Sequence, residues 1–139
     1  MYGILYHSYR ILEYDPINEI TSSVGGDVFD IRCGDGVFGK DLYAATDDGK
    51  VLKIDATNNS HRFVGIQVKS EHLSGGDGWG DAVLDIDGCI YCPPCDASRI
   101  LKYDPHTNLT SLAGDDFGAN ADKWSGGCLA ADRIFSPTQ

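Results

Sequence analysis

One five-residue pattern occurs three times in the chain and restricts its fold more than any other feature. The copies run from Ile11 to Asp15, from Val51 to Asp55 and from Ile100 to Asp104. Successive copies begin 40 and 49 residues apart. Each copy has the length of a β-strand and is rich in β-branched and other apolar residues. The pattern therefore predicts a strand-containing unit that is built several times over.

Other residues recur in the same register and extend this unit. An aromatic residue marks the strand before the repeated one at four places, namely Tyr6, Tyr43, Tyr91 and Phe135. Trp79 and Trp124 mark equivalent loops 45 residues apart. Turn residues such as Asp47-Asp48-Gly49 separate the strands, and no segment has a helical period. A period of roughly 40–50 residues with four strands per unit is typical of β-propeller blades.

We therefore predict an all-β, propeller-like fold of four-stranded antiparallel blades in a single domain over residues 1–139. The units cover residues 1–26, 27–68, 80–114 and 125–137, the first giving the last three strands of a blade and the last giving the first two. In the second unit, residues 28–33 are the predicted first strand and residues 37–40 an insertion.

The unit count bears on assembly. About three blades plus a partial one fall short of the ~4–8 blades of closed propellers. Three resolutions follow: the chain dimerises into a ring, it is part of a longer protein, or its C-terminal strands complete the N-terminal blade. We expect the first two.

The third unit also carries a family resemblance. Leu101 to Asn108 reads Leu-Lys-Tyr-Asp-Pro-His-Thr-Asn and resembles the strand and turn of the tandem β-propeller repeats of the YVTN/NHL-like group. Residues 88–127 are similar to a repeat abundant in algae and other protists, with Gly-Cys-Ile-Tyr-Cys-Pro, Ala-Ser-Arg-Ile-Leu and Lys-Trp-Ser-Gly-Gly in that order. The resemblance extends over nearly the whole chain, although Asp55-Ala56 replaces Asp-Pro in the second unit. It implies the propeller fold and leaves the activity open.

Composition excludes some partners. The formal net charge is −10 at pH 7 and the 11 Lys and Arg are scattered, so we expect no binding to nucleic acid. No apolar run has the ~18–20 residues of a membrane span, so we expect a soluble protein without membrane insertion. The five Cys are an odd number and mildly favour a reducing compartment. No secretory signal is visible, which predicts a cytoplasmic location, or an organellar one after removal of a leader.

Three cysteines form the most conspicuous chemical motif. Cys89, Cys92 and Cys95 have the spacing Cys-x-x-Cys-x-x-Cys, which suits zinc, an iron–sulfur cluster or a redox dithiol. The other copies of the unit lack these cysteines, and residues three apart on a strand point to opposite faces. We therefore expect small buried strand residues, with a metal site as the alternative.

Loops around the two tryptophans form the predicted binding face. The residues placed there are Trp79, Trp124, Asp77, Asp81, Asp116, Asp122, Lys123, His72 and Asp96, together with Glu71, Asp47, Asp48 and Cys95. An exposed Trp is a common binding anchor, and carboxylates bind Ca²⁺. The alternative is that each Trp packs between adjacent blades and the acidic residues are solvated.

No nucleophile–His–Asp set is recognisable, so we predict no catalytic residues. The predicted function is a non-catalytic scaffold or protein-interaction subunit, either a homo-oligomer or part of a larger complex, without a cofactor. One alternative, implied by the resemblance, is a metal-dependent enzyme of the lyase or lactonase kind, with a Ca²⁺ or Zn²⁺ ion near Asp77, Asp81 or Asp116. Another is carbohydrate binding through Trp79 and Trp124.

Overall fold

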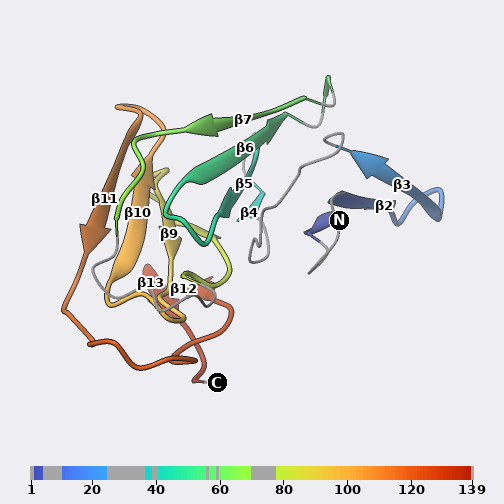
Figure 1. Cartoon of the computed structure of the whole chain (residues 1–139). Coiled ribbons are helices and arrows are strands. Elements are labelled where there is room, and N and C mark those ends of the chain that lie inside the picture. The colour runs from blue at the N-terminus through green and yellow to red at the C-terminus, as the bar shows by residue number, and fades with distance from the viewer. Residues whose placement is uncertain are drawn as a thin grey trace.

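A computed structural model of the chain describes residues 2–4, 11–24, 37–38, 41–55, 57–58, 60–69 and 78–138. All regular elements in these ranges are β-strands, arranged in four antiparallel sheets of two to four strands (Figure 1). The all-β, antiparallel prediction is confirmed at this level. No helix in the described ranges is long and apolar enough to cross a membrane.

The second sheet has the order β4-β5-β6-β7 and contains the second copy of the repeated strand. Its strands are β4 (Val37–Phe38), β5 (Leu42–Ala45), β6 (Val51–Asp55) and β7 (Ser60–Val64). Phe38 pairs with Leu42, so Val37–Phe38 is a strand of the sheet and its prediction as an insertion is wrong. Two residues are too few to show the alternating pattern of a strand, so the sequence alone does not identify it. Residues 28–33 lie outside the described residues.

The third sheet has the order β8-β9-β10-β11 and follows the predicted strands closely. Its strands are β8 (Val83–Leu84), β9 (Ile90–Cys92), β10 (Ile100–Asp104) and β11 (Leu109–Ala113). Asp104 ends β10 and accepts a hydrogen bond from the His106 amide at 2.8 Å. Asp55 accepts one from the Thr57 amide and Asp15 one from the Ile17 amide, both at 2.9 Å. The repeated aspartate is therefore a turn cap.

The N-terminal sheet repeats part of this arrangement with β1 (Tyr2–Ile4), β2 (Ile11–Asp15) and β3 (Ile20–Val24). Its β2–β3 register, Ile11 with Val24 through Asp15 with Ile20, is the register of β10 with β11. Tyr2 pairs with Glu13 on β2, as Tyr91 pairs with Lys102 on β10. Tyr2 therefore holds the place predicted for Tyr6, which lies outside the described residues.

The C-terminal hairpin copies the first two strands of the third sheet. It consists of β12 (Cys128–Ala130) and β13 (Arg133–Phe135). Its pairs Cys128–Phe135 and Leu129–Ile134 correspond to Val83–Tyr91 and Leu84–Ile90. A backbone bridge joins Trp124 to Thr138 just as one joins Trp79 to Pro94. The hairpin thus shares the pairing register of β8 with β9.

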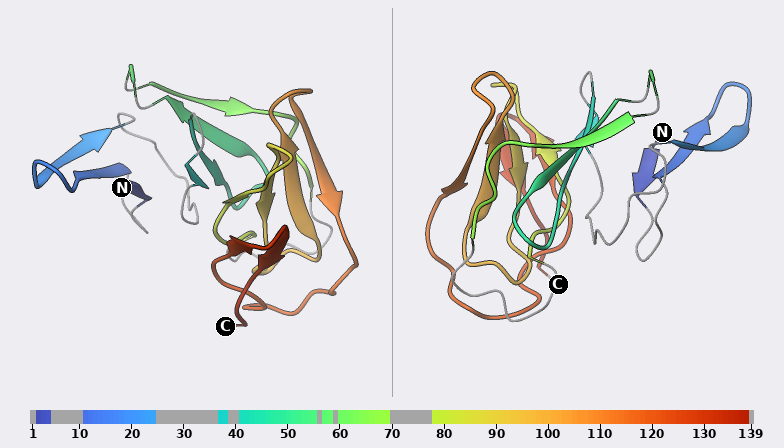
Figure 2. Two further views of the ribbon diagram at one scale, coloured as in Figure 1. Left: turned by 180° about the vertical axis from the view of Figure 1, so that it is seen from behind. Right: turned by 45° about the horizontal axis from the view of Figure 1, so that its top comes forward.

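The described core lies between the second and third sheets. Figures 1 and 2 show these two sheets next to each other, with β1–β3 on the other side of the second sheet. Tyr43 on β5 meets Tyr103 on β10 with ring centroids 5.7 Å apart. The Gly65 amide donates to Asn108 Oδ1 at 2.9 Å and the Ile66 amide to Thr110 Oγ1 at 3.1 Å, so polar contacts also join the sheets.

Candidate binding cleft beside the C-terminal hairpin

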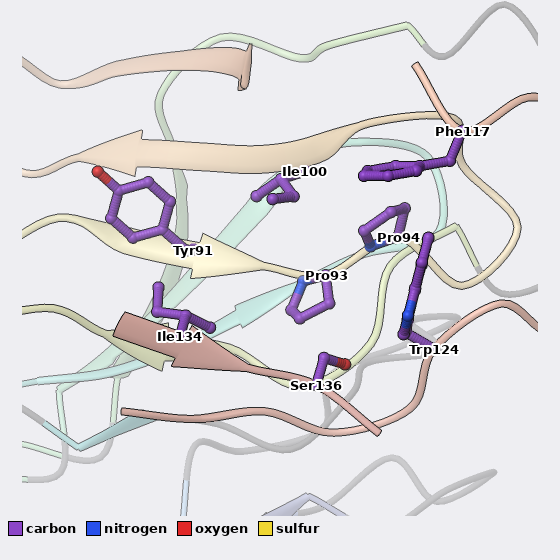
Figure 3. A pocket seen from close by; sticks show the side chains of 8 residues that line it. All are labelled: Tyr91, Pro93, Pro94, Ile100, Phe117, Trp124, Ile134 and Ser136. Atoms are coloured by element: carbon purple, nitrogen blue, oxygen red, sulfur yellow. The ribbon is translucent and has the colours of Figure 1, made fainter. Parts of the chain in front are cut away.

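An apolar cleft lies between the outer face of β9–β10 and strand β13. Its volume is about 220 Å³. The side chains that line it are Tyr91, Pro93, Pro94, Ile100, Phe117, Trp124, Ile134 and Ser136 (Figure 3). Figure 3 places Phe117, Pro94 and Trp124 at one end, and Tyr91 with Ile134 at the other.

The Trp124 end of the cleft is built by an aromatic pair. Phe117 and Trp124 meet edge to face with centroids 4.6 Å apart. The Phe117 amide donates to the Ser98 carbonyl at 2.8 Å, which anchors its loop to the segment before β10. Phe117 is nevertheless 41% exposed. This end therefore presents an ordered aromatic surface to solvent.

The Tyr91 end carries the polar groups. The Tyr91 hydroxyl donates to Asp87 Oδ2 at 3.0 Å, and Lys102 Nζ lies 5.3 Å from the centre of the Tyr91 ring. Burial raises the pKa of the Tyr91 hydroxyl, and contact with that hydroxyl raises the pKa of Lys102. At neutral pH this end therefore holds a neutral phenol beside a cation.

Each residue that lines the cleft has a counterpart in the core between the second and third sheets. Ile134 and Ser136 correspond through the pairing registers to Ile90 and Cys92, which are 1% exposed. The counterparts of the other six are Tyr43, Ala45, Thr46, Val51, Val68 and Trp79. In that core the facing positions are filled from the third sheet by Ala97, Leu101 and Tyr103, exposed by 0%, 0% and 3%. The cleft thus resembles this interface, but among the described residues none takes the places that Ala97, Leu101 and Tyr103 fill in the core.

The two predicted tryptophan anchors differ. Trp79 is 2% exposed and donates Nε1–H to the Arg99 carbonyl at 2.8 Å. It is therefore a core side chain between two sheets, as the packing alternative expects, and is not placed to stack on a sugar. Trp124 is half-buried and lines the cleft.

Three of the other predicted face residues, Asp116, Asp122 and Lys123, lie on the loop after β11. Asp122 donates its amide to Asp96 Oδ1 at 2.9 Å, and Lys123 Nζ is 3.2 Å from the Gly118 carbonyl. Asp116 accepts from the Gly118 amide at 2.8 Å, and its carboxylate is 3.9 Å from Arg99 Nε.

The carboxylate of Asp81 lies beside Gly126, further along the same loop. His72, Asp77 and Glu71 lie outside the described residues. Among the described residues, Asp96 contacts Asp122 and Lys123 next to Trp124, whereas Trp79 lies in the core.

One group in the described residues has the chemistry of a metal site. The ligand atoms of Cys95, Asp96 and Asp122 lie within 4.8 Å of one another, and zinc accepts thiolate and carboxylate ligands. Asp96 Oδ1 binds the Asp122 amide and the Cys95 carbonyl binds the Lys123 amide, so these contacts also close the loop.

The predicted cysteine trio is not this group. Cys89 and Cys92 are 6% and 1% exposed and outside it, and neither is in a disulfide. They occupy the small buried positions that the copies of the unit predict.

Sequence reasoning missed seven of the eight residues that line the cleft: Tyr91, Pro93, Pro94, Ile100, Phe117, Ile134 and Ser136. The signal that finds them is the repeat itself, because each corresponds to a buried or partly buried residue of the preceding unit. No protein-family model matches this chain, and no curated protein matches it.

Proposed function

We propose that this chain is a non-catalytic, β-propeller-like scaffold that binds protein, as an interaction subunit of a larger assembly. One observation carries the proposal: the cleft residues repeat the residues of a sheet–sheet core. Another polypeptide can cover such a surface, because burying its apolar side chains is favourable. The segment that fills the core also shows the shape that would fit the cleft.

The strand beside the cleft supports a protein ligand. Among the described residues, β12 is the strand that pairs with β13, whereas β9 pairs with both β8 and β10. An edge strand offers backbone donors and acceptors to an added strand, and a neighbouring cleft offers a place for its side chains. A small molecule would use the cleft and leave the edge unused.

The polar groups of the cleft do not favour catalysis. Ser136 donates its hydroxyl to the Gly126 carbonyl at 2.6 Å. The Tyr91 hydroxyl binds Asp87, and its pKa is raised, so it is a poorer nucleophile. Neither His61 nor His106 lines the cleft. The chemistry here is that of binding.

We also propose that the sheets are the blades of a β-propeller. The third sheet packs a face against the second, and their strands correspond in order and register. The C-terminal hairpin begins the next repeat in that register. These relationships support propeller blades, and with them the proposed relationship to YVTN/NHL-like repeats.

A peptide of residues 97–113, the chain's own segment that completes the core, tests the function directly. We expect it to bind the chain, measured by fluorescence anisotropy of the labelled peptide, and to lose binding to Ile134→Asp. Ile86→Asp is the matched control, because Ile86 is 78% exposed and outside the cleft. A peptide that binds Ile134→Asp as well as wild type, or binds neither, contradicts the proposal.

A second candidate function rests on Cys95, Asp96 and Asp122, whose grouping favours a metal-dependent role. The expected result for that candidate is one equivalent of zinc in protein purified without chelator, measured by elemental mass spectrometry. Cys95→Ser would then lower the metal content, and wild-type protein without metal would remove the candidate.

A further inference from the structure

We propose that the cleft is occupied by the β2–β3 hairpin of a second copy of this chain, with β2 adding to the edge of β13 that no strand of the described residues pairs with. This inference rests on the proposed function and names its partner. The cleft lies near the C-terminal end of the chain and the β2–β3 hairpin near the N-terminal end. Association between copies is therefore head to tail.

The core between the second and third sheets specifies what the occupant must look like. There, β10 places Leu101 and Tyr103 on the face that packs against the preceding sheet. β2 has Leu12 and Tyr14 at the same two positions of the repeated pattern. Both are half-buried in the single chain, whereas Leu101 and Tyr103 are 0% and 3% exposed. The hairpin therefore has apolar surface left to bury.

The register of the proposed pairing follows from the repeat. β9 pairs Cys92 with Leu101, Tyr91 with Lys102 and Ile90 with Tyr103. The corresponding pairs between copies are Ser136 with Leu12, Phe135 with Glu13 and Ile134 with Tyr14. Ile134 and Ser136 line the cleft, so this register directs Leu12 and Tyr14 into it.

Charge is complementary along the same pairing. One residue further, the register sets Arg133 opposite Asp15. Arg133 is exposed, and hydrogen bonds from Asn18 and the Ile17 amide lower the pKa of Asp15, which keeps its carboxylate ionised at neutral pH. Opposite charges directly across a strand pair stabilise that register. Tyr14 would also meet Lys102, as the charge of Lys53 acts on Tyr103 in the core.

The added strand takes the place of β1. β1 has three residues and pairs with the same edge of β2 that β13 would use. Exchanging it for β13 keeps backbone hydrogen bonds on that edge and adds the apolar contacts of the cleft. This replacement is related to domain swapping, in which copies exchange an identical element.

Cysteine cross-linking tests the pairing between two residues that only this register brings together. Copies carrying Phe135→Cys are mixed with copies carrying Glu13→Cys and oxidised. Both carry Cys128→Ser, because Cys128 pairs with Phe135 within one chain. Paired residues in an antiparallel sheet have Cα atoms about 4.5–5.5 Å apart, which a disulfide spans. We expect a heterodimer whose disulfide joins positions 135 and 13 by peptide mass spectrometry.

The matched control replaces Glu13→Cys by Ile17→Cys on the same hairpin. Ile17 is 88% exposed and lies in the turn, so it should give at least tenfold less heterodimer. Equal yields from Glu13→Cys and Ile17→Cys, or no heterodimer from either, overturn the inference.

A complementation experiment tests the same pairing without cysteine variants, in case one of them folds poorly. Ile134→Asp disrupts the cleft, and Tyr14→Asp disrupts the hairpin that would fill it. Each variant alone should sediment as a monomer, and the mixture should form a dimer, because each retains what the other lacks. A mixture that stays monomeric while wild type self-associates overturns head-to-tail pairing.

The outcomes separate this inference from the proposed function. Binding of the 97–113 peptide without cross-linking would retain the cleft as a protein site and reject a second copy as its occupant. Failure of both would reject the two together.

Because two copies each carry a net charge of −10, added salt should strengthen their association, whereas it would weaken a purely ionic contact.

Discussion

Tyr43 and Tyr103 come from different sheets and pack with their ring planes tilted by 42° and their centroids 5.7 Å apart. The Tyr103 hydroxyl also donates to Asn108 Oδ1 at 3.1 Å, and Asn108 Oδ1 accepts from the Gly65 amide. One side chain therefore contributes to the apolar and the polar parts of the sheet–sheet contact.

Tyr103 should accordingly separate the two contributions. Tyr103→Ala removes a buried ring and should lower the free energy of unfolding by about 3–5 kcal/mol. Tyr103→Phe keeps the ring and loses one hydrogen bond, which should lower it by about 0.5–1.5 kcal/mol. Urea unfolding measures both. Equal losses from the two variants would contradict the role given to the ring.

The two tryptophans form a second matched pair. Trp79→Phe loses packing in the core and the hydrogen bond to the Arg99 carbonyl, so it should reduce the free energy of unfolding by about 1–3 kcal/mol. Trp124→Phe at the half-open cleft should change it by less than about 1 kcal/mol. Thermal unfolding of the two variants measures both losses. A greater loss of stability from Trp124→Phe than from Trp79→Phe would contradict the assignment of Trp79 to the core.

Sequence reasoning recovered the strands where the repeat is dense and missed details where it is interrupted. The strand pattern from Ile100 to Asp104, with its capping aspartate, determines its hairpin through local interactions, so the prediction was correct. Val37–Phe38 is too short for a periodic pattern, and its role appears only in its pairing with β5. Short strands are specified by their neighbours rather than by their own composition.

Acid should destabilise the chain through its turn aspartates. The pKa of Asp104 is held below its ordinary value of 3.8 by the His106 amide and then by the Thr107 hydroxyl. A folded-state pKa below the unfolded value contributes stability above about pH 4, and that contribution is lost as the pH falls through the folded value.

Asp104→Asn keeps a capping oxygen without the charge. We expect the urea midpoint of this variant to fall less than that of wild type between pH 6 and pH 3. Asp115→Asn, at an exposed aspartate outside these turns, is the control and should keep the wild-type slope. A parallel loss in all three proteins would contradict the assignment.

Thiol reactivity should follow burial. Cys128 is exposed, whereas burial, and then the nearby charge of Asp87, raises the pKa of Cys89. In native protein at pH 8, iodoacetamide should label Cys128 at least tenfold faster than Cys89, read by peptide mass spectrometry. Unfolding in urea should remove the difference. Comparable native rates would argue against the buried placement of Cys89.

Two glycines distinguish backbone strain from a sheet contact. Gly65 has a φ of 71°, and a Cβ there would overlap Thr110 Oγ1. Gly118 has a φ of 76° with no atom within 4 Å of such a Cβ. Gly118→Ala should lower the free energy of unfolding by about 1–2 kcal/mol, the price of the left-handed backbone. Gly65→Ala should lower it by about 1–3 kcal/mol more, measured by urea unfolding. Equal effects would mean that the overlap is relieved without loss.

The candidate site was predicted less well than the strands, for a physical reason. Trp79 and Trp124 are equivalent in sequence but differ in exposure because only Trp79 has a sheet packed on both sides. Burial by a neighbouring unit is a tertiary property that residue type does not encode. The repeat predicts which positions correspond, and the structure is needed to see which of them are covered.

Tyr103 packs against both Tyr43 and Gly65, and these contacts join the second and third sheets. Copies that join by the proposed pairing would repeat such contacts and would therefore take a similar angle to each other. The number of chains in a closed assembly would then be an angular quantity, encoded between two sheets of one chain. Concentration would govern how completely such an assembly forms, whereas the angle between the sheets would govern how many members it has.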